Sequence, residues 1–443
     1  MINLPRKTRQ AIGIAGVLLV TLSACSSGEP KPDEVPVESE LPGPTGAESD
    51  DPSAPEQAGP TPRSQPDPAE VAGHVQARID AALSRIEEGD RATAIDILTQ
   101  LVEEPEGGYL AAFNLGVLYD RQGDGENAVR RYVQALQLEK DFSPALVNLV
   151  RLYIRAGQIS EADAVARRMI DASPENLDHR AAQLEVTIAQ GRYEDAVRGA
   201  RDILRKDERH VEAMFQMARA NVRLERYELG RSILTSALKL APERADLYYL
   251  FGVIEWELEN TDGAIANFEK AVELQPFFPE ARNNLAVLLH EAGDYPGAIA
   301  HLQKAVEDFP EFKQAYVNLG NSLKGAAKYG EAEEAFKRAI AIDSAFADAH
   351  FNLGILYLES EVPGYEEIER YTKAIESFNA YRTAARDRLS DSDPVNAYIN
   401  EANGAIEQAR AREEMLRRQQ MLQQEQSEPE DGDASNEDGG NDA

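Results

Sequence analysis

Residues 314–343 read QAYVNLGNSLKGAAKYGEAEEAFKRAIAID, and their pattern decides the fold. Tyr316 and Leu319 lie on one apolar stripe before a glycine-containing turn. Ala332 and Phe336 lie on a second stripe after it. A spacing of three or four residues places side chains on one face of an α-helix, so the stretch predicts two amphipathic helices joined by a turn.

The same pattern repeats along the chain. Starting at Val75, the sequence divides without a gap into units of equal length, which begin at positions 75, 109, 143, 177, 211, 245, 279, 313 and 347. The eighth position of most units is small, although Val150 and Leu184 depart from this rule. The twentieth position is small in all eight complete units; its residues are Ala94, Ala128, Ala162, Ala196, Gly230, Ala264, Ala298 and Ala332. Small residues let two helices approach closely, so the sequence predicts helix pairs stacked in one register.

The motif resembles that of the tetratricopeptide repeat family over residues 75 to about 388. The positions that carry the resemblance are Tyr316, Leu319, Gly320, Tyr329, Ala332, Phe336 and Ala339. It implies an all-α, right-handed superhelical solenoid that docks proteins, with about nine units over residues 71–388. In the ninth unit an insertion at 361–368 displaces the small residue to Ala374. A capping helix is predicted within 389–426.

Residues 1–24 are typical of a bacterial signal peptide, with basic residues before a short apolar run. Leu22, Ser23, Ala24 and Cys25 resemble a lipobox, which implies a mature chain that begins at lipidated Cys25. The alternative is an ordinary secretory signal with a chance cysteine. Since Cys25 is the only cysteine, the protein forms no intramolecular disulfide.

Two terminal segments lack the composition of folded domains. Residues 26–70 carry eleven of the 23 prolines, eleven acidic and two basic residues, and no aromatic ring. We therefore expect a disordered tether over 25–70 and a disordered acidic tail over 427–443. The net charge of −32 argues against nucleic acid as a partner.

Motifs for catalysis are missing from the sequence. It contains no phosphate-binding loop, no nucleophile elbow and no zinc-protease motif, and its six histidines are scattered. We predict no enzyme activity, no cofactor and no metal site. A periplasmic small-ligand binder or enzyme is the alternative of a different class, disfavoured because an open groove offers no enclosed apolar pocket.

Family resemblance also suggests where a partner binds. The first helix of each unit lines the concave face in this family. In some members asparagines at the sixth position form a ladder that grips the backbone of an extended peptide, as an amide both donates and accepts. The matching residues here are Asn114, Asn148, Asn284, Asn318 and Asn352, interrupted by Ala182, Gln216 and Leu250. The alternative is that asparagine is simply common at this position and has no such role.

Four arginines lie in the interruption or in the unit just before it. Arg151 and Arg155 are four residues apart in one unit, as are Arg219 and Arg223 two units later, so each pair shares a helical face. Flanking aromatic residues are Phe215, Tyr249 and Trp256. We interpret this patch as a candidate pocket for an acidic or aromatic partner segment. The alternative is salt bridging to Glu185, Glu212 and Glu225.

Taken together, the sequence predicts a scaffold of the bacterial cell envelope that docks other envelope proteins or extended peptides and is held to the membrane by its lipid anchor. Ser26 after the cysteine favours the outer membrane, facing the periplasm, in a host with two membranes. A gliding-motility complex is the process favoured by the long tether and the interrupted last unit. The alternatives are assembly of type IV pili or of the outer membrane, and an adaptor of murein enzymes.

Overall fold

The computed structural model describes residues 68–104, 107–386, 389 and 393–427, and within them places 19 α-helices, α3 to α21. The described residues form two compact units, one of residues up to 288 with 304–311, and one of residues 289–303 and from 312 onward. The signal peptide, Cys25, nearly all of the tether and the acidic tail lie outside the described residues.

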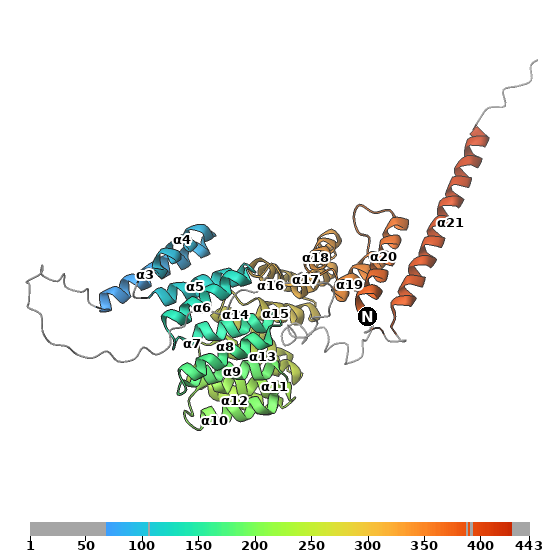
Figure 1. Cartoon of the computed structure of the whole chain (residues 1–443). Helices are drawn as coiled ribbons and strands as arrows, with labels where there is room; N and C mark the ends of the chain where they lie inside the picture. Colours follow the sequence, from blue (N-terminus) through green and yellow to red (C-terminus); the bar gives the residue numbers. More distant parts are fainter. Residues whose placement is uncertain (1–67, 105–106, 387–388, 390–392, 428–443) are drawn as a thin grey trace, which may run out of the picture. The chain divides into compact units, whose positions relative to one another are not determined.

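Helices occur in consecutive pairs, one pair for each predicted unit (Figure 1). The first helices are α3 (Pro68–Glu87), α5 (Gly108–Arg121), α7 (Ser143–Arg155), α9 (Leu177–Ala189), α11 (Val211–Arg223), α13 (Ala245–Glu257), α15 (Pro279–Glu291), α17 (Lys313–Gly325) and α19 (Ala347–Glu359). The second helices are α4 (Arg91–Val102), α6 (Gly125–Leu138), α8 (Ile159–Ala172), α10 (Tyr193–Leu204), α12 (Tyr227–Leu240), α14 (Thr261–Leu274), α16 (Tyr295–Asp308), α18 (Tyr329–Ile342) and α20 (Glu367–Ala385). The last helix is α21 (Val395–Ser427). This confirms the all-α repeat solenoid, although α3 begins inside the segment assigned to the tether.

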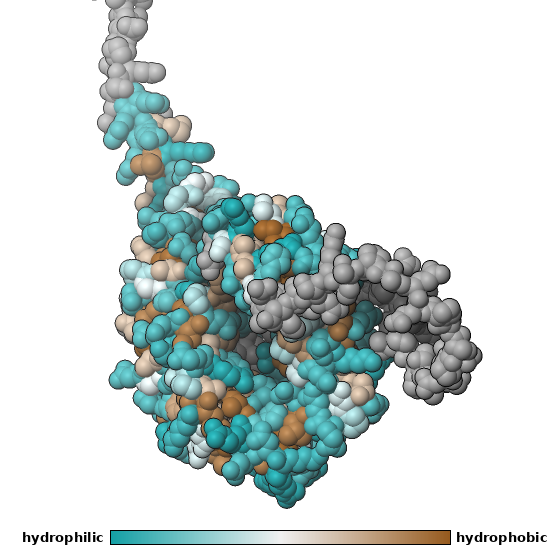
Figure 2. All heavy atoms as spheres, turned by 90° about the vertical axis from the view of Figure 1, so that its left-hand side faces the viewer, coloured by the Kyte–Doolittle hydropathy of each residue, from teal (hydrophilic) through white to brown (hydrophobic). Residues whose placement is uncertain are grey.

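The core confirms the predicted register. The alanines at the twentieth position are completely buried, and Gly230 is buried as well. A Cβ atom on Gly116 would lie 2.6 Å from the Tyr132 ring, and one on Gly354 would lie 2.6 Å from the Phe378 ring. The missing side chain at the eighth position therefore makes room for an aromatic ring of the second helix. Figure 2 shows one outer face of the protein, where hydrophilic residues cover most of the surface and apolar residues form small groups.

Leu184, one of the two exceptions at the eighth position, has a packing explanation. Leu184 extends over the second helix of its unit, where its Cδ2 atom would be 2.6 Å from a Cβ on Gly199, and the next residue is the fully buried Ala200. Ala200 takes the position that Tyr132 and other large residues occupy elsewhere. Large and small residues have exchanged places across the helix pair, which keeps the filled volume similar.

In the first eight units, the turn between the two helices ends the first helix with a left-handed residue. In the third unit Gly157 has φ +74°, and the N–H of Gln158 donates to the carbonyl of Tyr153 at 2.9 Å, which is a Schellman motif. Positions with positive φ recur once per unit at the same place; they are Gly89, Gly123, Gly157, Gly191, Glu225, Glu259, Gly293 and Ala327. The turn therefore repeats even where the sequence does not supply glycine.

Replacing a non-glycine residue at one of these turns with glycine should stabilise the protein. Ala327 has φ +59°, a conformation that costs an L-residue about 1–2 kcal/mol and costs glycine little. We expect Ala327→Gly to raise the free energy of unfolding by about 0.5–1 kcal/mol, measured by urea denaturation. The matched control is Ala341→Gly, an exposed position within α18, which should lower it by about 1 kcal/mol. Two changes of the same sign would contradict the explanation.

The insertion in the ninth unit folds back onto the preceding second helix. Tyr365 donates to Glu333 on α18 at 2.7 Å, and Val362 is buried. Ala374 is completely buried, as the delayed register predicted. Insertions of this kind commonly form exposed loops, and most of residues 361–368 are exposed. Val362 differs, because its apolar side chain is buried in the core.

The first half of α21 closes the apolar end of the ninth unit. Its start is held by Asp393, which accepts the N–H of Val395 at 2.9 Å. Tyr398 stacks on Phe378 with ring centroids 5.6 Å apart, and Ala402 is completely buried. This polar helix therefore covers the end of the ninth unit with a short apolar stripe near its N-terminus.

A cluster of four side chains joins repeats that are far apart in sequence. We call it the Phe277 clasp, and it consists of Arg121, Phe277, Lys304 and Asp308. The guanidinium of Arg121, at the end of α5, lies 5.0 Å from the centre of the Phe277 ring, and the Lys304 ammonium lies 5.5 Å from it. Lys304 also pairs with the nearly buried Asp308 at 3.1 Å. Burial lowers the pKa of Arg121, while Asp308 opposes that change. Cation–π contacts thus link the second repeat to the end of the sixth.

Candidate functional site

First helices of successive repeats lie against one another from α5 through α13, so equivalent positions one repeat apart become neighbours. Arg151, Glu185 and Arg219 are the ninth residues of three consecutive repeats and form what we call the Glu185 triad. Arg151 Nε lies 3.0 and 3.1 Å from the two carboxylate oxygens of Glu185, and Arg219 donates to the same carboxylate. The Glu185 side chain is 2% exposed.

The triad is balanced electrostatically. Burial alone would raise the pKa of Glu185, but the two arginines outweigh burial and hold that pKa below its ordinary value. Burial likewise disfavours the charged form of Arg151, yet Glu185 and Glu212 raise its pKa. Arg151 therefore stays charged, and both arginines are engaged by Glu185 within the protein.

A second charged group continues the network. Arg244 donates to Glu212 at 3.0 Å and to Asp246 at 3.0 Å. The centre of the Phe215 ring lies 5.7 Å from the guanidinium carbon of Arg219 and 5.5 Å from that of Arg244. The sequence placed Phe215 beside a basic patch, but acidic neighbours offset the positive charge. The salt-bridging alternative thus describes Arg151 and Arg219, which both pair with Glu185. Glu212 pairs with Arg244 instead.

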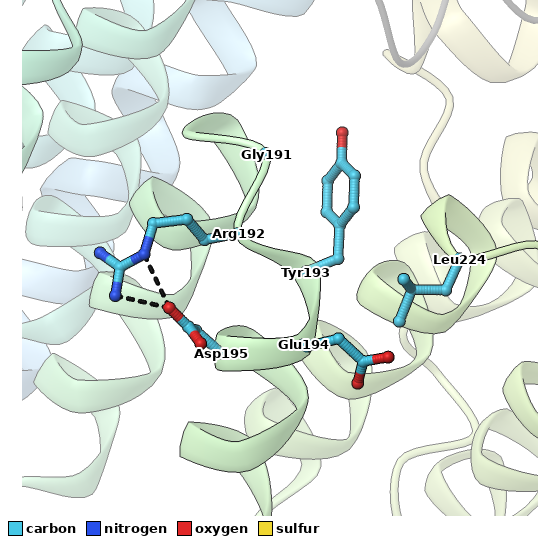
Figure 3. Close-up of a pocket in the computed structure, with 6 residues that line it drawn as sticks. All are labelled: Gly191, Arg192, Tyr193, Glu194, Asp195 and Leu224. Carbon is cyan, nitrogen blue, oxygen red and sulfur yellow. Dashed lines mark hydrogen bonds and ion pairs between the residues drawn. The ribbon is translucent and has the colours of Figure 1, made fainter.

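The other two predicted arginines diverge from the triad. Arg155 pairs with Asp120 on α5. Arg223 donates to the hydroxyl of Tyr193 at 2.6 Å and lies 5.0 Å from the centre of its ring. Tyr193 belongs to a small hollow of about 310 Å³ at the turns of two adjacent repeats, where it stands between Arg192 and Leu224 (Figure 3). Arginines that share a helical face therefore have different interaction partners.

Tyr249 and Trp256 are packing residues. Tyr249 accepts a hydrogen bond from Asn284 at 3.4 Å, and its ring centre is 5.0 Å from that of Phe278. Burial raises the pKa of the Tyr249 hydroxyl. Trp256 meets the Phe268 ring edge-on at 6.3 Å. Both rings stabilise the sixth repeat, and neither joins the triad.

The predicted asparagine row is used mostly within the fold. Asn114 and Asn352 donate to the carbonyls four residues earlier in their own helices, at 2.8 and 2.7 Å. Asn148 donates to the Tyr132 hydroxyl at 3.4 Å, and Asn284 is 1% exposed. Asn318 also has a partner. The interruption is buried throughout: Ala182 is 1%, Gln216 0% and Leu250 5% exposed.

A depression of about 600 Å³ crosses the N-terminal ends of four first helices, α7, α9, α11 and α13. Of the predicted residues, Asn148 and Arg151 line it. Its other lining residues are Ser143, Pro144, Val147, Asp178, Asp207, Arg209, His210, Val211, Glu212, Arg244 and Asp246. Apart from Glu212, which the sequence analysis named as an acid of the salt-bridging alternative, these other residues were not singled out from the sequence. They come from the first turns of helices and the loops before them, and the available signal was an acidic residue at the second position of successive repeats, as at Asp178 and Asp246.

His210 joins two walls of this depression. Its Nδ1 accepts the N–H of Ala213 at 3.1 Å and so caps α11, and its Nε2 lies 3.3 Å from Asp178. This arrangement fits a neutral imidazole that donates through Nε2. The hydrogen bond with Asp178 raises the pKa of His210 against the effect of burial.

Metal ligands and membrane-spanning segments are the two other features that bear on function. Over the residues that the structure describes, no cluster of three or more histidine, cysteine or acidic side chains is arranged to hold a metal ion. None of the described helices combines the length and apolar character needed to cross a membrane.

Comparisons with known proteins agree with this architecture. Family models described as tetratricopeptide repeat match residues 79–145, 121–185, 185–245, 215–266 and 249–311, and one described as TPR repeat matches 328–360. No curated protein gives a significant match.

Several solved structures are similar in fold. A chain of the APC/C hetero-tetramer Cut9-Hcn1 is 16% identical with a TM-score of 0.54, over 74% of this chain and 63% of that one. PilF of Pseudomonas aeruginosa is 19% identical with a TM-score of 0.39, over 47% of this chain and 94% of that one. YrrB, described as a TPR protein with an unusual peptide-binding site, is 20% identical with a TM-score of 0.30, over 49% of this chain and 95% of that one. This chain therefore spans less than two thirds of the Cut9-Hcn1 chain, and that likeness shows the fold.

Proposed function

We propose that this chain, which belongs to the tetratricopeptide repeat family, is a membrane-anchored scaffold that docks partner proteins in the bacterial cell envelope. Proteins built from these repeats bind proteins or peptides and are generally not catalytic. The observation that carries the docking proposal is the depression across α7, α9, α11 and α13, because four consecutive repeats contribute to one continuous surface. A partner segment lying there would contact groups of both charges.

The membrane anchor rests on the sequence. Leu22 to Cys25 resemble a lipobox, and the acidic, proline-rich tether would separate the repeats from the bilayer. Ser26 favours the outer membrane, with the repeats facing the periplasm. Among envelope processes we favour a gliding-motility complex. Assembly of type IV pili or of the outer membrane, and an adaptor for murein enzymes, are the next alternatives.

Lipidation has a direct test. Cells that express the full chain are fed an alkyne-labelled fatty acid, and the purified protein is examined for the label. The native chain should carry it, and Cys25→Ser should not, because the thiol is the group that is alkylated. An unlabelled native chain would exclude the anchor while leaving the docking surface to be tested separately.

The docking surface is tested by photo-crosslinking in intact cells. A photoreactive residue replaces Val147, which lines the depression, and the matched control replaces Ser236, which is exposed on α12. We expect protein crosslinks from position 147 and none of the same mass from position 236. Arg209→Glu, an exposed change in the same depression, should reduce them. Arg219 is a poor choice for charge reversal, because a new carboxylate there would face Glu185.

The small-ligand alternative predicts the opposite outcome. Thermal melting of the protein with metabolite pools would then show stabilisation, since a ligand that binds the native state raises its melting temperature. A metabolite-dependent shift without any protein crosslink at position 147 would overturn the scaffold proposal.

A further inference from the structure

The C-terminal part of α21 extends beyond the fold that its first half covers (Figure 1). Arg412 makes an ion pair with Glu367 on α20 at 2.7 Å. After Arg412, residues 413–424 are all exposed. They include four large apolar side chains, Met415 at 65%, Leu416 at 57%, Met421 at 61% and Leu422 at 50% exposed. These four account for most of the exposed large apolar residues among the described part of the chain.

Such a segment lacks the support that keeps helices folded in water. Isolated helices shorter than about 12–15 residues are marginal, because packing of an apolar face supplies most of the stability of a helix. Here each of the four apolar side chains is at least half exposed to solvent. A partner helix would supply the missing burial.

The charges in this segment indicate which partner fits. Glu413 and Glu414 are followed by Arg417 and Arg418, and none of the four makes an ion pair with a described residue. Their charges cancel, although the whole chain carries −32. Two copies of this segment can therefore meet without the repulsion that other acidic surfaces of the protein would produce.

We propose that the exposed ends of α21 from two copies of this chain pair with each other as antiparallel helices. When Met415 of one copy lies beside Leu416 of the second copy, the acidic pair of each helix faces the basic pair of the other. A parallel arrangement in register would instead place glutamates against glutamates and arginines against arginines. Charges at the edges of a helix–helix contact select the orientation in this way.

A membrane surface is the competing occupant of an exposed apolar helix. Helices that lie on anionic membranes carry an excess of lysine and arginine on the polar face. The two glutamates remove that excess here, so the second copy fits the observed chemistry better.

Sedimentation velocity of the full chain with Cys25→Ser tests the proposal. We expect a concentration-dependent dimer, and we expect R417E/R418E to weaken it by at least about tenfold, because like charges then meet on both sides. The fourfold exchange E413R/E414R/R417E/R418E should restore the dimer. The control R167E/R168E makes the same charge change at adjacent exposed arginines on α8 and should leave the dimer intact. All variants share one N-terminal segment, so differences among them report on α21.

Disulfide trapping tests the orientation in the same Cys25→Ser background. Antiparallel pairing centred between Met415 and Leu416 brings the two copies of position 416 close together and keeps the two copies of position 422 apart. Leu416→Cys should therefore give a covalent dimer on a non-reducing gel, and Leu422→Cys should not. Equal trapping at both positions, a monomer at all concentrations, or a dimer unaffected by R417E/R418E would overturn the proposal.

Discussion

Replacing Glu185 with alanine should lower the free energy of unfolding by about 3–5 kcal/mol, the usual cost of removing one partner from a buried ion pair. Two arginines would then lack their acid at the contact of α7, α9 and α11. We expect the lower end of this range, because the Arg151 and Arg219 side chains are 37% and 25% exposed and can gain some water. Urea denaturation followed by circular dichroism measures the change.

The control is an exposed pair of the same type. Glu194 bonds to Arg226 with both side chains about half exposed. Glu194→Ala should leave the unfolding midpoint unchanged, because water and salt already weaken such pairs. A loss below about 1 kcal/mol for Glu185→Ala would show that the triad is not the stabilising contact we describe.

Lowering the pH should weaken the same triad by protonating Glu185. Since the folded-state pKa of Glu185 lies below its ordinary value of 4.5, its ionisation stabilises the protein fully above that value. That contribution is lost as the pH falls through the lower folded-state pKa. The difference in unfolding free energy between the native chain and Glu185→Gln should therefore shrink as the pH falls below about 4.5. A constant difference down to pH 3 would contradict the assignment.

Exchanging Leu184 and Ala200, where large and small residues have changed places, should show that the two side chains fill one shared volume. Leu184→Ala leaves a cavity and should cost about 2–5 kcal/mol, and Ala200→Leu overfills the contact and should cost about 1–3 kcal/mol. The double variant restores the arrangement of large and small residues seen in most repeats. We expect it to recover more than half of the summed loss in a double-mutant cycle by urea denaturation.

A pair of distant sites provides the comparison. Ala271 is completely buried in the sixth repeat, so Ala271→Leu with Leu184→Ala should be additive to within about 0.5 kcal/mol. If the L184A/A200L pair were equally additive, the two residues would not share one volume, and the explanation of the exception at Leu184 would fail.

The register of the repeats was predictable from the sequence, whereas the contacts of individual side chains were harder to predict. Burial of Ala94 or Ala332 follows from a repeated position that only a small residue fits, so periodicity alone identifies it. For Arg151 the sequence left a pocket and a salt bridge as alternatives, and the choice depended on which side of α9 carries Glu185. The equal spacing of Arg151, Glu185 and Arg219, each one repeat after the last, contained that information. A position that alternates in charge between repeats predicts pairing across them.

Contacts between remote repeats were beyond the sequence. The Phe277 clasp depends on how far each helix pair rotates from the one before, and small rotations accumulate over several repeats. Arg121 and Phe277 carry no local pattern that marks them as partners.

The Phe277 clasp changes how the repeats should respond to shortening. In a stack with contacts between neighbours alone, deleting repeats from the N-terminus removes a fixed increment of stability each time. Here, a deletion that passes Arg121 would also release the distant loop after α14, so that this one step should be disproportionately damaging. Experimenters who seek a minimal fragment should therefore keep α5, because the boundary of an autonomous piece is set by topology and cannot be read from repeat counting.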